Sequence, residues 1–168
     1  TQPITKNLIL YAKWVEFGYQ VKFVDYDNKV LDTQYVKSSQ SATPPEQPTR
    51  EGYTFDHWIG TYTNVTQDVV IKASYTINSY QVSFETNGAG TLPVQTLNYG
   101  SYVVAPENPE KIGYTFEGWF KDSQLEVPYN FENIVKADIK LFAKWSKNVY
   151  TVIFYKDNYE VLAEIEVN

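Results

Sequence analysis

The chain contains an internal duplication, and this duplication restricts its possible folds more than any other feature of the sequence. The segment GYTFDHW at residues 52–58 returns as GYTFEGW at residues 113–119, 61 residues later. Residues 19–58 and 80–119 align without a gap and share 14 identities. A repeat of this length marks a structural unit that is used more than once. We therefore expect two related small modules rather than one large domain.

The two copies also indicate where the modules begin and end. They keep the same spacing up to Trp58 and Trp119, and the second copy then takes more residues to reach its final segment. Insertions in repeats usually lie in surface loops, so we expect an extra loop at about 121–133. Shorter matches at residues 8–14 and 150–154 indicate partial copies. In chain order we predict the final strand of a preceding repeat, repeat module 1, repeat module 2 and the opening hairpin of a further repeat, at residues 1–16, 17–78, 79–147 and 148–168.

Alternating apolar and polar residues predict that each module is made of strands. Tyr, Val and Phe occupy every second position at the start of each copy, and a turn rich in Gly, Asn or Asp follows. Such turns supply the positive φ angles of tight hairpins. A second strand, a proline-bearing crossing, the Gly-Tyr-Thr-Phe strand and a final strand complete the unit. The expected second strands cover about 30–37, 92–99 and 160–167.

Helix signals are weak by comparison. Only residues 131–137 could form a helix, of one or two turns. The predicted fold class is therefore mostly β, or α+β at most, with small modules in tandem and little helix.

Aromatic residues supply the core that a small module needs. They make up 17% of the chain, with 15 Tyr, 9 Phe and 4 Trp, and there is no Cys to form a disulfide. A module of roughly 65 residues buries only about 60% of its unfolded surface, and each buried aromatic side chain contributes about 1.5–3 kcal/mol. We expect the recurring glycine to meet a backbone requirement and the recurring rings to pack inside. The predicted structural motif residues are Gly52, Tyr53, Phe55, Trp58, Tyr75, Gly113, Tyr114, Phe116, Trp119 and Trp145, together with Trp14 of the preceding partial copy.

Taken together, these motifs resemble the Listeria–Bacteroides repeat, the B-repeat of internalin-type bacterial surface proteins. Residues 80–145 match it most fully, with a Tyr-x-Val-x-Phe opening, a Tyr-Gly pair, two prolines, Gly-Tyr-Thr-Phe-x-Gly-Trp and Leu-Phe-Ala-Lys-Trp. The first copy has His57 in place of the usual glycine and lacks a Tyr-x-Phe insertion. The resemblance implies small β-grasp, ubiquitin-like modules strung in tandem on a secreted, wall-attached protein of the bacterial cell surface. It implies no catalytic residues.

No residue pattern predicts catalysis, a metal site or a cofactor. His57 is the only histidine, so a Ser-His-Asp triad cannot recur in both copies. Asp25, Asp27 and Asn28 are spaced like the start of a calcium loop, but the later Gly and Glu of an EF-hand are missing. A hairpin turn explains this triplet better. We predict a protein that is not an enzyme and that uses no cofactor and no metal.

Charge and hydropathy exclude two kinds of partner. The formal net charge is −6, whereas nucleic-acid binding needs a basic face that displaces counterions. No run approaches the roughly 18–20 apolar residues of a membrane span. We therefore expect neither nucleic-acid binding nor direct insertion into a membrane.

Two functions remain open for the modules. They could be spacers that contact neighbouring repeats of the same chain and hold another domain away from the cell wall. Alternatively they could be adhesive, binding a host surface protein along an exposed strand edge or a glycan on exposed tyrosines, and the ligand-binding residues are unknown. A contiguous exposed patch among several tyrosines would favour adhesion. These tyrosines are Tyr11, Tyr26, Tyr35, Tyr62, Tyr99, Tyr102 and Tyr159.

The partial copies at the two ends suggest one further partner. Residues 8–14 and 150–167 are expected to be strands without the rest of their modules. Unpaired strand edges invite pairing with another chain. Self-association through the terminal strands is therefore predicted.

Overall fold

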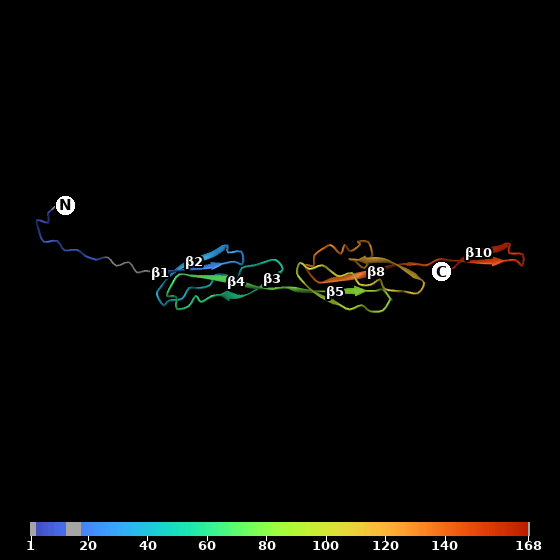
Figure 1. Ribbon diagram of the computed structural model, residues 1–168, viewed down its shortest axis with the longest axis horizontal. Coiled ribbons are helices and arrows are strands. Elements are labelled where there is room, and N and C mark those ends of the chain that lie inside the picture. Colours follow the sequence, from blue (N-terminus) through green and yellow to red (C-terminus); the bar gives the residue numbers. More distant parts are fainter. Residues whose placement is uncertain (1–2, 13–17, 168) are drawn as a thin grey trace. The chain divides into compact units, whose positions relative to one another are not determined.

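The structure is a computed structural model that describes residues 3–12 and 18–167 (Figure 1). It divides into two compact units, Thr1–Thr76 and Ile77–Asn168. Within the described residues there are only strands and loops and no helix, so the mostly-β prediction is confirmed. The strands are β1 (Gly18–Val24), β2 (Val30–Lys37), β3 (Tyr53–Ile59), β4 (Val69–Ile77), β5 (Ser79–Glu85), β6 (Gln95–Asn98), β7 (Tyr114–Phe120), β8 (Ile139–Lys147), β9 (Tyr150–Tyr155) and β10 (Val161–Val167).

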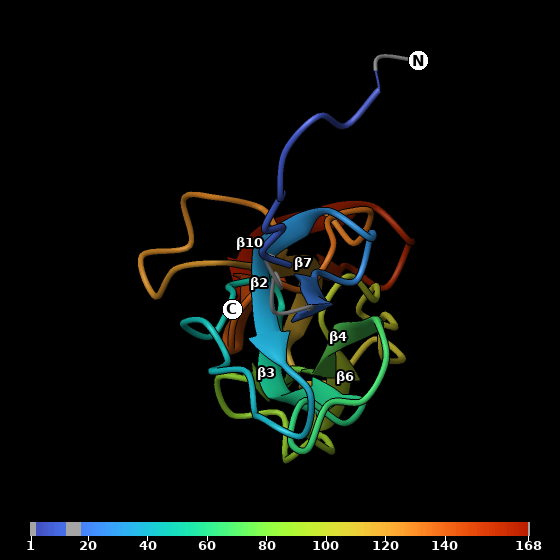
Figure 2. The same cartoon turned by 90° about the vertical axis from the view of Figure 1, so that its left-hand side faces the viewer.

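The first unit contains one four-stranded sheet with the order β2-β1-β4-β3. Figure 2 labels three of its strands, β2, β3 and β4. β1 pairs antiparallel with β2, so that Val21 lies opposite Gln34. On its other side β1 pairs parallel with β4, so that Val21 lies opposite Val69. Parallel neighbours need a long crossover connection, and here the proline-bearing segment and β3 provide it.

The second unit repeats this sheet with the order β6-β5-β8-β7. Val82 on β5 lies opposite Gln95 on the antiparallel side and opposite Ile139 on the parallel side. The duplication therefore extends from sequence to topology and register. β6 is shorter than the predicted strand 92–99, because Pro93 has no backbone N–H to give to a ladder.

Each sheet buries one face, and loops rather than a helix cover it. In the first unit Val21, Phe23 and Ile71 come from the sheet, while Ala42 and Val65 come from loops. In the second unit the loop residues are Val103 and Val135, above Val82, Phe84, Leu141 and Ala143.

The predicted helical turn at 131–137 is wrong. The backbone N–H of Val135 donates to the carbonyl of Ser101 at 2.8 Å. This donor is thus committed to a distant loop and not to the residue four positions earlier, as a helix requires. The segment crosses the core as a strap, and the N–H of Val65 makes the same kind of bond to the carbonyl of Gln40 at 2.8 Å in the first unit.

Residues 121–133, the expected insertion, form a loop that begins where β7 ends. Phe120 makes an isolated bridge with Pro128, and the N–H of Lys121 donates to the carbonyl of Val127 at 2.9 Å. The Asp122 carboxylate accepts the N–H groups of Glu126 and Val127 at 3.1 and 2.8 Å. These amide bonds lower the pKa of Asp122 from its usual value.

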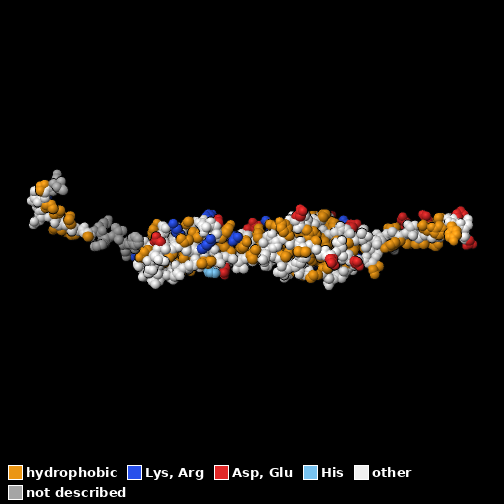
Figure 3. All heavy atoms as spheres, in the orientation of Figure 1, with side chains coloured by type: hydrophobic (Ala, Val, Ile, Leu, Met, Phe, Trp, Pro, Cys, Tyr) orange, Lys and Arg blue, Asp and Glu red, His pale blue; other side chains and the backbone are white. Residues whose placement is uncertain are grey.

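The predicted strand at 8–14 does not form over its described part. Residues 8–12 carry no strand, their apolar side chains are exposed, and Trp14 lies outside the described residues. The equivalent strands β4 and β8 are each held between two neighbours, whereas no described strand pairs with residues 8–12. β9 and β10 do form the predicted hairpin, with apolar side chains exposed along it (Figure 3).

Candidate functional site

The Gly-Tyr-Thr-Phe segment starts from a tight turn that requires glycine. Gly52 and Gly113 both have φ of 77°, a region that residues with a Cβ rarely adopt. The N–H groups of Tyr53 and Tyr114 donate to the carbonyls of Arg50 and Lys111 at 3.1 and 3.0 Å. A Cβ at Gly113 would meet open space, so the backbone angle alone explains why glycine recurs.

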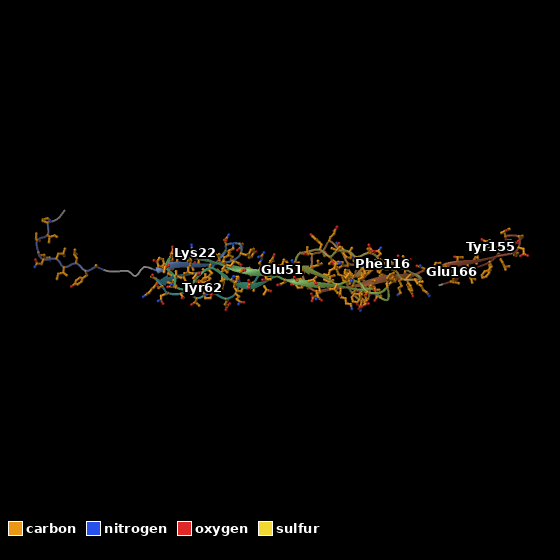
Figure 4. All side chains as sticks on the ribbon, turned by 60° about the horizontal axis from the view of Figure 1, so that its bottom comes forward. Lys22, Glu51, Tyr62, Phe116, Tyr155 and Glu166 are labelled. Carbon is orange, nitrogen blue, oxygen red and sulfur yellow. The ribbon has the colours of Figure 1, made fainter. Side chains whose placement is uncertain are left out.

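A chain of edge-to-face ring contacts crosses each sheet. In the second unit Phe116, labelled in Figure 4, lies 5.5 Å from Trp119 and 5.4 Å from Trp145 between ring centroids. Trp119 in turn lies 5.0 Å from Phe84. The rings of Tyr75, Phe55, Trp58 and Phe23 repeat this chain in the first unit, with centroids 5.1–6.0 Å apart. Such contacts add about 0.5–1.5 kcal/mol each beyond the area that they bury.

A β-bulge brings the tryptophan onto the core face. Phe116 and Trp119 are three residues apart, so in a regular strand they would point to opposite faces. The register between β7 and β8 shifts between Phe116 and Gly118, and Gly118 has φ of 130°. The extra residue turns Trp119 inward. Strand alternation alone could not have predicted this.

A cation packs on the motif rings in both units. The Arg50 guanidinium carbon lies 3.9 Å from the ring centre of Tyr26 and 3.6 Å from that of Tyr53. In the second unit Lys111 takes this position, with its Nζ 4.4 Å from the Tyr114 ring centre. These are cation–π contacts. These contacts were not predicted, although a basic residue stands two positions before the recurring glycine in both copies.

The last ring in each series of ring contacts, Tyr75 in the first unit and Trp145 in the second, also makes a polar contact. The Tyr75 hydroxyl donates to Oδ1 of Asp25 at 2.6 Å, and burial followed by this bond raises the pKa of Tyr75 to about 12. At the equivalent place the Trp145 Nε1–H donates to the carbonyl of Thr86 at 2.8 Å. The donor changes between the copies together with its acceptor.

The calcium-like triplet is part of the hairpin turn, as the sequence favoured. Asp25 accepts the Tyr75 hydroxyl, Asp27 accepts the N–H of Lys29 at 3.0 Å, and Asn28 has φ of 67°. No three His, Cys, Asp or Glu side chains gather to hold a metal ion in the part of the chain that the structure describes. His57 lies on the surface, with Nδ1 2.8 Å from Asp56.

One glutamine, which recurs in both copies as Gln34 and Gln95, binds a loop backbone and was not predicted. Gln34 donates through Nε2 to the carbonyl of Thr43 at 2.5 Å and accepts its N–H at 3.0 Å. Gln95 makes the same pair of bonds to Val104 at 2.6 and 3.1 Å. Both residues are among the 14 identities, which was the available signal.

The tyrosines that could have formed a binding patch are spread over several parts of the chain. In the first unit, Tyr35 is 71% exposed on β2 and bonds Gln20, whereas Tyr26 lies in the turn beneath Arg50. Tyr62 packs against Phe23 in the core. The others are Tyr11 in the N-terminal segment, Tyr99 and Tyr102 in the second unit, and Tyr159 in the β9–β10 turn.

Comparison with known proteins finds relatives along the whole chain. The family model of the Listeria–Bacteroides repeat domain matches residues 19–79 and 80–144. A protein of Evansella cellulosilytica named as a Gly-rich membrane protein is 32% identical, over 99% of this chain and 20% of the relative. Another membrane protein of that bacterium is 31% identical, over 95% and 26%. Internalin H of Listeria monocytogenes is 30% identical, over 88% and 27%. This chain thus spans about a fifth to a quarter of the length of these relatives.

Among solved structures, one match is a pair of Streptococcal High Identity Repeats in Tandem domains, SHIRT domains 3-4, from a cell surface protein. Its sequence identity is 20%, it covers 79% of this chain and 98% of its own, and the TM-score is 0.34. The described residues contain no helix that is long and apolar enough to cross a bilayer.

Proposed function

Because this chain belongs to the Listeria–Bacteroides repeat domain family, we propose that it consists of non-catalytic repeat modules of a bacterial cell-surface protein. The modules act as a semi-rigid spacer that presents other domains of the same protein away from the cell wall. Two relatives are named as membrane proteins and one as an internalin, which agrees with a place at the cell envelope.

The observation that carries this proposal is what the duplicated residues do. Gly52 and Gly113 make the turn. Gln34 and Gln95 bind the loops, and the recurring tryptophans at 58 and 119 pack in the cores. Each acts inside its own module. The residues shared by the two copies are therefore those that form the module itself. This is expected if selection acts on an array of similar units.

The short junctions and the acidic charge support the spacer role. Only Asn78 separates β4 from β5, and only Asn148 and Val149 separate β8 from β9. Such connections leave little slack between consecutive elements. The net charge of −6 keeps an array soluble and disfavours its collapse.

Distance measurements between spin labels test whether the array is semi-rigid. The chain has no native cysteine, so Tyr35→Cys and Tyr102→Cys, both exposed positions, give two unique labels. We expect a narrow distance distribution. The matched control carries Gly-Ser-Gly-Ser inserted between Ile77 and Asn78, which should broaden it. Equally broad distributions for the two proteins would contradict the semi-rigid spacer.

Adhesion is the second candidate function. The scattered tyrosines do not support it, but a groove in the second unit does.

A further inference from the structure

The insertion gives the second unit a surface groove. The groove has a volume of about 360 Å³, within the roughly 300–1,000 Å³ of typical ligand sites. It lies between β7, the proline-bearing segment and residues 128–131 of the insertion. Its lining includes Pro106, Asn108, Glu117, Trp119, Tyr129 and Phe131.

Two residues that line the groove, Trp119 and Tyr129, each carry a buried polar atom without a hydrogen-bond partner. Trp119 is 5% exposed, and neither its Nε1–H nor the hydroxyl of Tyr129 has a partner in the described structure. Burial raises the pKa of Tyr129. An unpaired buried donor is costly, and buried polar groups in proteins are nearly always satisfied. By contrast, Trp145 in the same core donates its Nε1–H to Thr86.

The fold holds these two side chains together at the groove. The N–H of Tyr129 donates to the carbonyl of Trp119 at 2.8 Å, which fixes the insertion beside β7. The Tyr129 ring meets Phe131 edge-to-face with centroids 4.9 Å apart. The first copy has a shorter connection after Trp58 and no Tyr-x-Phe segment, so it cannot build this wall.

The groove combines apolar ring surface with both donors and acceptors. Trp119 can only donate through its indole, Glu117 can only accept, and the amide of Asn108 can do both. A proline-rich peptide offers mainly carbonyl acceptors and therefore gains no hydrogen bond from the exposed Glu117 carboxylate. An anion would be repelled by Glu117. Hydroxyl groups donate and accept, and a sugar ring also has apolar C–H faces that can cover Phe131.

We propose that this groove binds a neutral saccharide residue. Its hydroxyl groups bond Asn108 and Glu117 at the rim and accept from Trp119 and Tyr129 in the wall. The last two atoms are covered in the free protein, so the Tyr129 side chain rotates when the sugar enters, while its backbone bond to Trp119 is kept. The site belongs to the second unit and is independent of the spacer role, because a spacer can carry it or lack it.

Nuclear magnetic resonance of the ¹⁵N-labelled full chain tests this proposal at the indole N–H of Trp119, assigned from Trp119→Phe. The probes are maltose, lactose and N,N′-diacetylchitobiose, with a polyproline peptide as the competing ligand class. We expect at least one saccharide to shift the Trp119 signal saturably. Trp58 is the internal control, because its module lacks the insertion, and its signal should stay unchanged.

A matched pair of surface variants locates the contact. Asn108→Ala should weaken saccharide binding about three- to tenfold, the range for one lost hydrogen bond. Gln47→Ala, the equivalent change in the first copy, should leave the affinity unchanged. Spectra of the β5 amides for Asn108→Ala, and of the β1 amides for Gln47→Ala, confirm that each variant is folded.

Three results would overturn the saccharide site. They are no saturable shift of Trp119 with any of the sugars, equal shifts of Trp58 and Trp119, or a response to the polyproline peptide alone. None of them affects the distance distribution that tests the spacer, so the two proposals fail separately.

Discussion

Replacing Leu141 by Ala should destabilise the second module and leave the first unaffected. Leu141 is fully buried at the centre of the second sheet, on β8 beside β5. Losing its buried side chain forfeits about 1.5–3 kcal/mol of transfer free energy, and the cavity adds to this, so we expect a cost of about 3 kcal/mol. For a domain of this size, each kcal/mol lowers the melting temperature by roughly 4–8 °C. The second module should therefore melt roughly 12–24 °C earlier.

Calorimetry and amide hydrogen exchange together measure this effect. Calorimetry gives the melting temperatures, and exchange at Val82 and Phe84 reports the second module separately from Val21 and Phe23 in the first. Ile71 occupies the place of Leu141 in the first module and is also fully buried. Ile71→Ala should therefore lower the melting temperature and the amide protection of the first module and leave the second unaffected.

The control is Lys140→Ala, on the residue next to Leu141. Lys140 is exposed and lies 3.2 Å from Glu85, and exposed ion pairs contribute about 0–1 kcal/mol, so little should change. If Leu141→Ala lowers protection equally at Val21 and Val82, the two modules unfold as one cooperative body. The inference of independent repeats would then be wrong.

Four further predictions concern the motif and the hairpin. Tyr75→Phe should remove a pH dependence: the pKa of Tyr75 is raised to about 12, so its contribution is full below pH 10, the ordinary tyrosine value, and is lost between about pH 10 and 12. Urea unfolding at pH 8 and pH 11.5 checks this, and an equal loss in wild type and variant would refute it. Gly113→Ala should cost about 1–2 kcal/mol because φ is 77°, whereas Gly113→Asn should cost less; equal losses in thermal melts would count against backbone strain as the cause. Arg50→Ala should lower the free energy of unfolding by about 0.5–2 kcal/mol through the loss of its cation–π contacts. Arg50→Lys should retain most of the stability in the same denaturant assay, and equal losses for the two variants would show that the cation does not contribute. The full chain should self-associate through the exposed edge of β9, and Phe154→Lys should weaken this association. A monomer in sedimentation at high micromolar concentration would contradict the prediction.

Much of the sheet architecture could be predicted from alternation and duplication. The opening strand of each module follows a short-range pattern, in which every second side chain is apolar and faces the core. Val21 and Phe23 are fully buried as this period requires. The length of β6 was less predictable, because Pro93 removes a ladder donor while leaving the apolar pattern intact.

Features that depend on distant partners could not be predicted. The inward position of Trp119 needs a bulge that only the pairing of β7 with β8 creates. Residues 8–12 show the same dependence, since their sequence matches β8 but no strand of the described residues pairs with them. The groove requires Tyr129 and Trp119 to meet through a backbone bond, and spacing along the chain gives no sign of that contact.

The parallel pairing at the centre of each sheet determines how a module bears tension. β1 enters the first module and β4 leaves it, and the two lie side by side with Val21, Lys22, Phe23 and Val24 opposite Val69, Val70, Ile71 and Lys72. Because the strands are parallel, pulling on the start of one and the end of the other slides them along each other. The interstrand hydrogen bonds then share the load and must break together, whereas in a hairpin pulled open from one end they break one at a time. β5 and β8 have the same geometry, so each module should resist stretching along the chain more strongly than its small core suggests.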